Sequence, residues 1–215
     1  MTIDDRLRKG YAHFKTSVFE KDRALYEKLA QHGQQPHTLV IACSDSRVLP
    51  QQILSAGPGE LFVVRNVAAM VPPYEADSGY HGTSAAIEFA VTGLEVDNII
   101  VMGHAGCGGV ASVVDKNLPD DSFVGNWMRP LKDWLVTYDD MTAQDPMTRK
   151  RLLERAAVSL SIQNLRNFPF VADRIRAGTL SVEGLLFNIH TGDLSKVIAK
   201  HDTAFSLQSI LGEQE

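Results

Sequence analysis

The chain has 215 residues, with 26 acidic and 21 basic side chains, a formal net charge of −5 at pH 7 and a hydrophobic fraction of 44%. This composition is ordinary for a globular protein with a core of its own, and the acidic balance argues against a nucleic-acid partner. The only two cysteines, Cys43 and Cys107, exclude a scaffold held together by several disulfides.

The beginning of the chain is charged and contains no apolar run, so we expect no secretory signal. No apolar stretch reaches the roughly 18 residues that a membrane-spanning helix needs. We therefore predict a cytoplasmic protein without a membrane partner. In that reducing compartment, paired cysteines bind metal or react more often than they form a disulfide.

The first predicted element is a helix over residues 4–31. Its apolar residues recur every three or four positions and so form one stripe along the helix. The stripe consists of Leu7, Tyr11, Phe14 and Val18, and a second stripe of Leu25 and Leu29 follows it. Gly33 and Pro36 end the pattern. Either the core of this chain or a second subunit should cover the stripe.

Apolar runs of strand length follow at residues 38–42, 60–65 and 98–103. A helical pattern covers residues 82–94, and another helix is expected after residue 109. Continuous apolar strands that alternate with helices are typical of parallel sheets covered on both faces. We therefore predict an α/β fold with a central, mostly parallel β-sheet flanked by helices.

The remainder of the chain reads as helical and charged up to about residue 167, with a break near 144–146. Its densest charges predict a solvated helix face, made of Arg149, Lys150, Arg151, Glu154 and Arg155. Beyond it we expect a helix break at 168–170, a short helix over 171–177, and a last strand over 180–189 followed by a turn at 191–193.

We predict a single domain over residues 1–215. Within it, residues 1–33 form an N-terminal helical arm, and residues 34–120 form the α/β core that carries both cysteines. Residues 121–215 supply a helical region and the C-terminal strand. No repeat or low-complexity linker interrupts the sequence.

Both cysteines follow predicted strands. Cys43 comes directly after the run 38–42, while His104 and Cys107 come after the run 98–103. Ligands of open parallel sheets gather beyond these carboxyl ends. Two thiolates and one imidazole form a donor set that Zn²⁺ favours. The fourth position would fall to Asp45 or to water, and a replaceable fourth ligand is typical of catalytic zinc.

Three other interpretations compete with a zinc site. Free cysteines often fill cores, although these two lie in polar, glycine-rich turns. A cysteine phosphatase needs a longer loop than the three residues between Cys43 and Arg47. Residues 106–111 fit the dinucleotide pattern G-x-G-x-x-A, but no strand precedes the acidic pair at 120–121 that the pattern would require.

Two motifs, CSDSR at 43–47 and GHAGCGG at 103–109, resemble the signature pair of the β-class carbonic anhydrases. The similarity runs from about Gln34 to Val110, and within the family the sequence is most similar to the plant-type branch. The resemblance implies the β-carbonic anhydrase fold and a zinc lyase activity. The implied reaction is the reversible hydration of carbon dioxide to bicarbonate and a proton, by attack of zinc-bound hydroxide.

By this resemblance, Cys43, His104 and Cys107 would bind Zn²⁺. Asp45 and Arg47 would form the adjacent catalytic pair. Asp45 would accept a proton from the attacking group and so orient it, while the Arg47 guanidinium would keep the carboxylate off the metal. Without that restraint, Asp45 would be a candidate fourth ligand in a resting form.

The resemblance also implies a substrate pocket formed by Gln34, Phe62, Val67 and Gly108, which lies partly across a dimer interface. A homodimer or a higher homo-oligomer is therefore expected. Phe89 stands where the plant-type branch usually has a tyrosine. Any hydrogen bond that the family makes with that hydroxyl would be lost here.

Two alternatives keep the same zinc site. The first is a hydrolase of carbon disulfide or carbonyl sulfide, which would need a narrow apolar entrance. The sequence does not clearly indicate such an entrance. The second is a non-catalytic zinc-binding scaffold, which would have no use for Asp45 and Arg47. Both are separated from carbon dioxide hydration by direct assay.

Overall fold

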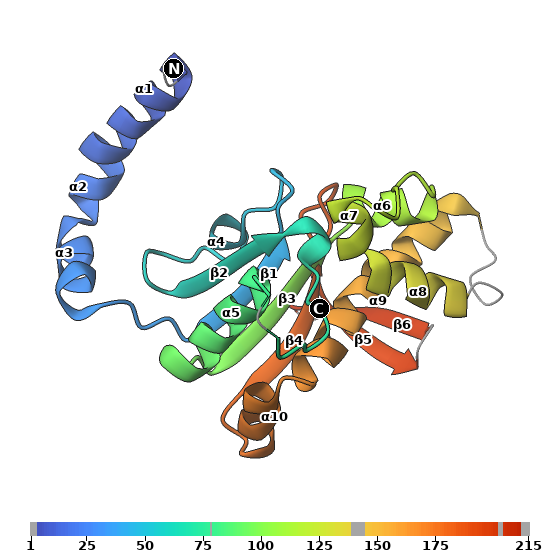
Figure 1. The fold of residues 1–215 in the computed structure, drawn as a ribbon. Coiled ribbons are helices and arrows are strands. Elements are labelled where there is room, and N and C mark those ends of the chain that lie inside the picture. The colour runs from blue at the N-terminus through green and yellow to red at the C-terminus, as the bar shows by residue number, and fades with distance from the viewer. Residues whose placement is uncertain (1–3, 78, 139–144, 202–203, 212–215) are drawn as a thin grey trace.

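The computed structural model describes residues 4–77, 79–138, 145–201 and 204–211. At its centre is a six-stranded sheet with the order β2-β1-β3-β4-β5-β6 (Figure 1). The first four strands along the chain pair in parallel, and the last two pair antiparallel. The strands are β1 (Thr38–Cys43), β2 (Leu61–Asn66), β3 (Asn98–His104), β4 (Ser181–Phe187), β5 (Leu194–His201) and β6 (Ala204–Ser209). The prediction of a mostly parallel sheet flanked by helices is confirmed.

Helices connect the strands and precede the first of them. In chain order they are α1 (Asp5–His13), η1 (Phe14–Val18), α2 (Phe19–Lys21), α3 (Arg23–His32), α4 (Pro50–Ile53), η2 (Val67–Ala69), α5 (Gly82–Glu88), η3 (Phe89–Gly93), α6 (Gly108–Val114), α7 (Phe123–Trp127), α8 (Arg129–Thr137), α9 (Pro146–Arg166) and α10 (Pro169–Arg176). Within the described ranges, no helix combines the length and the apolar character needed to cross a membrane.

The central strands are apolar on both faces because both faces are covered. Leu39 and Ile41 of β1 belong to a core cluster with residues of α5, η3, α9 and α10. Val40 and Ala42 belong to a second cluster, which Val48 and side chains around α4 complete. All four strand residues are 0% exposed. This packing fixes the carboxyl ends of the central strands, where both cysteine motifs begin.

The N-terminal helices α1 to α3 form an arm that extends away from the sheet (Figure 1). None of these helices contains a buried residue. The predicted stripe is present but faces solvent in the single chain, and Tyr11 is 64% exposed. The base of the arm lies against the body, where Leu29 meets Gly59. The core of this chain therefore does not cover the stripe.

The strand predicted over 180–189 exists as β4, but the expectation that it is the last strand was wrong. The turn after it reverses the chain as expected, with Gly192 at φ 81° and its N–H bonded to the Asn188 carbonyl at 2.8 Å. The hairpin of β5 and β6 then extends the sheet edge. Both strands of this hairpin mix polar and apolar residues, and such strands give a weaker sequence signal than the fully buried strands of the sheet centre.

The prediction of a solvated face on α9 was also wrong. Glu154 is only 6% exposed, and Arg149, Lys150 and Arg155 are partly buried, whereas Arg151 is exposed. The cause is the position of α9, which contacts α6, α8, α10 and several strands and is therefore covered on more than one side.

Close contact between α9 and β4 gives a stability prediction for Gly184→Ala. A Cβ at Gly184 would lie 2.5 Å from a Val158 methyl group and 2.8 Å from a methyl of Ile162. Relieving such overlap costs about 1–3 kcal/mol of the free energy of unfolding, which a denaturant titration measures. Gly10→Ala is the control, because a Cβ at that position in α1 would meet no atom of the described residues within 4 Å. Equal unfolding midpoints for both variants would contradict the prediction.

Candidate active site

The three predicted metal ligands lie together at one end of the sheet. Cys43 ends β1, and His104 ends the neighbouring strand β3, while Cys107 directly precedes α6. Their candidate ligand atoms all lie within 4.8 Å of one another. The three residues are 6%, 1% and 3% exposed, respectively. The parallel pairing of β1 and β3 thus joins two motifs that are distant in the sequence.

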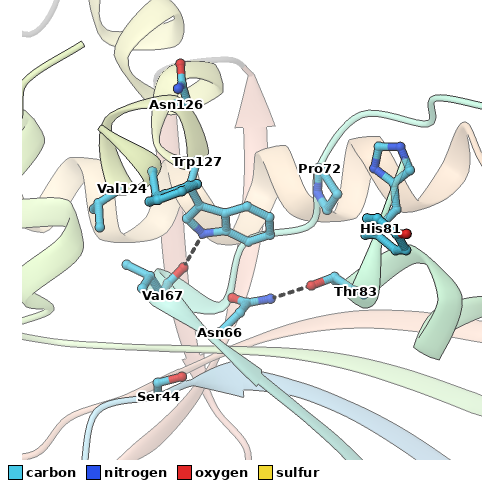
Figure 2. A pocket seen from close by; sticks show the side chains of 12 residues that line it. Ser44, Asn66, Val67, Pro72, His81, Thr83, Val124, Asn126 and Trp127 are labelled. Atoms are coloured by element: carbon cyan, nitrogen blue, oxygen red, sulfur yellow. Dashed lines mark hydrogen bonds between the residues drawn. The ribbon is translucent and has the colours of Figure 1, made fainter. Parts of the chain in front are cut away.

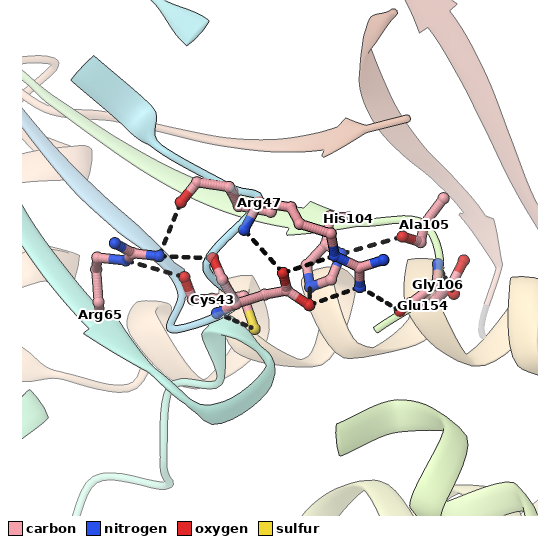
Figure 3. Close-up of polar contacts among 9 residues, drawn as sticks. Cys43, Arg47, Arg65, His104, Ala105, Gly106 and Glu154 are labelled. Atoms are coloured by element: carbon pink, nitrogen blue, oxygen red, sulfur yellow. Dashed lines mark hydrogen bonds and ion pairs between the residues drawn. The ribbon is translucent and has the colours of Figure 1, made fainter. Parts of the chain in front are cut away.

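The His104 ring presents an unsatisfied nitrogen to this cluster. Its Nδ1 lies 3.0 Å from the Ala105 carbonyl oxygen, which can only accept, so Nδ1 carries the proton (Figure 3). Its Nε2 therefore has a free lone pair, and this buried atom has no hydrogen-bond partner among the described residues. A buried polar atom without a partner is costly unless a ligand satisfies it. A metal-binding histidine has this arrangement.

The two thiols cannot both ionise easily. The pKa of Cys43 is lowered to about 4, chiefly because the Cys107 thiol donates a hydrogen bond to it. The pKa of Cys107 is raised by that same bond and by burial beside the Cys43 charge. Two adjacent buried thiolates require a cation between them. The donor set and its burial therefore fit zinc, which binds thiolate and imidazole.

Backbone geometry around the cluster supports the Cys43 thiolate. The Asp45 N–H donates to Cys43 Sγ at 3.4 Å, and the Ala68 N–H is a further donor. Ala68 and Ala69 adopt left-handed conformations with φ of 63° and 54° although neither is glycine. Both are buried, so the surrounding core holds this strained turn in place.

Asp45 and Arg47 form a two-pronged ion pair beside the ligands (Figure 3). Arg47 Nε donates to Asp45 Oδ1 at 2.9 Å and Nη2 donates to Oδ2 at 2.7 Å. The backbone N–H of Arg47 also donates to Oδ1, at 3.0 Å. These hydrogen bonds hold the pKa of Asp45 well below its usual range. Asp45 Oδ2 lies 3.9 Å from His104 Nε2, so the carboxylate stands beside the ligands while bound to Arg47.

Glu154 is a site residue that sequence reasoning missed. Its Oε1 accepts a hydrogen bond from the Gly106 N–H at 2.7 Å, which ties α9 to the turn between His104 and Cys107. Burial raises the pKa of this carboxyl group. One signal was available: Glu154 shares a helical face with Val158, Ser161 and Leu165, all of which are buried.

A cavity of about 700 Å³ opens next to Ser44, the residue after Cys43 (Figure 2). Val67 and Trp127 form part of its wall, and the indole Nε1 donates to the Val67 carbonyl at 2.9 Å. Asn66 and Thr83, joined by a hydrogen bond of 3.3 Å, line it as well. Predominantly apolar walls with a few polar groups are typical of small-molecule sites.

Comparison with known proteins identifies the family. The family model described as carbonic anhydrase matches residues 38–194. β-Carbonic anhydrase 3 of Arabidopsis thaliana is 38% identical over 213 aligned residues, covering 94% of this chain and 81% of the relative. The chain belongs to the β-carbonic anhydrase family.

Solved structures of β-carbonic anhydrases share the fold. CcaA is 31% identical, with a TM-score of 0.80 over 94% of this chain and 98% of its own. A β-carbonic anhydrase of Sordaria macrospora, from a pair described as tetrameric, is 29% identical. Its TM-score is 0.78, and the match covers 90% of this chain and 97% of that one.

The predicted pocket residues of this β-carbonic anhydrase divide into two groups. Val67 lines the cavity, and Gly108 directly follows Cys107. Phe62, by contrast, pairs with Leu39 near the amino end of β1, and Gln34 precedes that strand. Phe62 packs on Phe89 instead, with ring centroids 5.8 Å apart. One chain of this β-carbonic anhydrase therefore does not bring Gln34 and Phe62 to the ligands.

Loss of one thiol should abolish metal retention by this β-carbonic anhydrase. Cys43→Ala leaves two protein ligands, so we expect zinc affinity to fall by at least about 100-fold, the upper range for losing even an indirect ligand contact. Zinc content after gel filtration and competition with a chromophoric chelator measure the change. Ser46→Ala, at an exposed position of the same turn, should retain zinc. Wild-type zinc affinity in Cys43→Ala would exclude the site.

Proposed function

We propose that this β-carbonic anhydrase catalyses the reversible hydration of carbon dioxide to bicarbonate and a proton, with zinc bound by Cys43, His104 and Cys107. One observation carries the proposal: the three buried ligand atoms lie within 4.8 Å of one another, and the Asp45–Arg47 pair stands beside them in a member of this family. The experiment that tests it measures zinc stoichiometry and stopped-flow carbon dioxide hydration on one preparation.

When bound, zinc would act as a Lewis acid that makes water nucleophilic near neutral pH. The residues around it would then control orientation. Asp45 stays ionised because of its lowered pKa, and each of its oxygens can accept hydrogen bonds beyond those from Arg47. It would therefore accept a hydrogen bond from the nucleophile and fix the direction of its lone pair. Arg47 holds both carboxylate oxygens and so restrains Asp45 from joining the ligands.

Carbon dioxide is small and apolar, which suits a wall containing Val67 and Trp127. We propose that Val67 and Gly108 contact the substrate in their own chain. Gln34 and Phe62 of a second copy would complete the pocket. The amide of Gln34 would donate a hydrogen bond to an oxygen of the substrate.

A homodimer or higher homo-oligomer would explain why the N-terminal arm extends away from the sheet of its own chain. Its apolar stripe is exposed in the single chain, and the related Sordaria macrospora enzymes are described as tetrameric. We propose that the arm packs on a second copy, which would also bring the distant pocket residues into place. The division into arm (1–33), site-bearing core (34–120) and remaining segment (121–215) of one domain belongs to the same proposal.

We also propose a reducing compartment, the cytoplasm, because both thiols must stay unoxidised to bind zinc. Parallel assays with carbon dioxide, carbon disulfide and carbonyl sulfide test the substrate. Carbon dioxide should be the preferred one, since all the named relatives are carbonic anhydrases. A zinc-loaded protein that turns over none of the three would contradict the proposed function and support a scaffold.

Arg47→Ala should separate catalysis from metal binding. Without its guanidinium, Asp45 is free to move toward the ligands, and we expect kcat/KM to fall about 100-fold with zinc content unchanged. Arg176→Ala is the control, because Arg176 forms an exposed ion pair with Asp173 at 3.0 Å on α10. Wild-type hydration rates in Arg47→Ala would refute the role of the pair.

Tyr11→Glu tests the role of the arm. A charge in the middle of the stripe should weaken an apolar interface, so sedimentation velocity should show a smaller species at low concentration. Val136→Glu, at a 77% exposed position of α8, should leave the oligomer unchanged. A wild-type protein that sediments as a monomer would exclude the proposed assembly.

A further inference from the structure

One arginine outside the predicted site binds the turn that carries the catalytic pair. Arg65 lies on β2, and its guanidinium donates to three backbone carbonyls at the end of β1 and in the turn after it (Figure 3). Nε donates to the Cys43 carbonyl at 3.1 Å. Nη2 donates to the carbonyls of Asp45 at 2.7 Å and Val48 at 2.8 Å.

Arg65 donates at the point where the chain leaves the sheet. Sheet pairing of β1 with β2 ends at Cys43 and Asn66, and the Ser44 N–H still reaches the Asn66 carbonyl at 2.8 Å. Beyond it the turn departs from the sheet, so its carbonyls need partners other than strand N–H groups, and the Asp45 carbonyl also accepts from the Val48 N–H at 3.0 Å. A planar guanidinium can satisfy several at once, which fixes their relative positions.

Two of the three carbonyls belong to Cys43, a proposed metal ligand, and to Asp45, the carboxylate of the proposed catalytic pair. Holding the Cys43 and Asp45 carbonyls fixes the backbone from which the metal ligand and the carboxylate project. Asp45 Oδ2 is 3.9 Å from His104 Nε2, so a small rotation of the turn would carry it among the ligand atoms.

We propose that Arg65 is a positioning residue that holds this turn so that Asp45 faces Arg47 rather than the metal ligands. The inference rests on the proposed function for its catalytic consequence, but the position of Asp45 is testable without turnover. Arg65 acts through Asp45 and Arg47 and need not touch the substrate.

A matched pair of substitutions tests the proposal. Arg65→Lys keeps the charge but loses the planar fork. Arg174→Lys is the control, because Arg174 also binds backbone carbonyls, those of Val91 at 3.2 Å and Thr179 at 2.8 Å. Thermal unfolding should show comparable losses of stability for both. Should Arg65→Lys fail to fold, Arg65→Gln provides a second variant with an amide donor.

We expect Arg65→Lys to retain zinc while kcat/KM falls about tenfold or more, and Arg174→Lys to stay within about twofold of wild type. A double-mutant cycle adds the decisive measurement. In an Arg47→Ala background the pair is already lost, so Arg65→Lys should reduce kcat/KM by less than about twofold further. Independent, multiplicative losses would overturn the proposal, as would loss of zinc from Arg65→Lys.

Cobalt substitution supplies a readout that does not depend on activity. The visible bands of bound Co²⁺ report its ligands, and Arg65→Lys should shift them in the same direction as Arg47→Ala. Arg174→Lys should leave them unchanged. An unshifted Arg65→Lys spectrum would overturn the positioning role even in an active enzyme. A shifted spectrum in a protein that hydrates no carbon dioxide would retain it and refute the proposed function alone.

Discussion

The sulfur atoms of Cys43 and Cys107 share a buried space with the His104 imidazole, where only one thiol ionises readily unless a cation lies among them. Burial removes the water that would otherwise screen the two negative charges. The Nε2 atom of His104 is also buried without a hydrogen-bond partner among the described residues, so it too requires a ligand. A thiophilic divalent ion satisfies both at once. The geometry of the sheet end therefore matters as much as the identity of the three residues.

Segments far apart in the chain hold that geometry. Glu154, from α9, fixes the turn that separates His104 from Cys107. The strained turn at Ala68 directs an N–H toward the Cys43 thiolate. Arg65, from β2, binds the turn on the other side of Cys43. The candidate ligands thus lie at or just after two strand ends, but the groups that hold their turns come from α9, from β2 and from the turn at Ala68.

Sequence reasoning predicted that Cys43, His104 and Cys107 would meet because parallel strands end at one edge, and that geometry follows from pattern alone. Asp45 and Arg47 were predicted as a catalytic pair from the family resemblance. It missed Glu154 because a charged residue in a charged run is usually solvated, and only the tertiary position of α9 buries it. It missed β5 and β6 because both strands mix polar with apolar residues and so give a weaker signal than the buried central strands. The sequence did not decide whether the apolar stripe of the arm packs on its own chain or on a second chain. A stripe such as that around Tyr11 looks the same in both cases.

The pairing of β1 with β3 also bears on how the protein acquires its metal. In an unfolded chain only His104 and Cys107 are near neighbours, and Cys43 joins them only once the two strands align across the intervening crossover. Such non-local parallel pairing is slow to form. Metal binding should therefore follow assembly of the sheet. The bound ion should then stabilise the contact between two segments that meet late in folding.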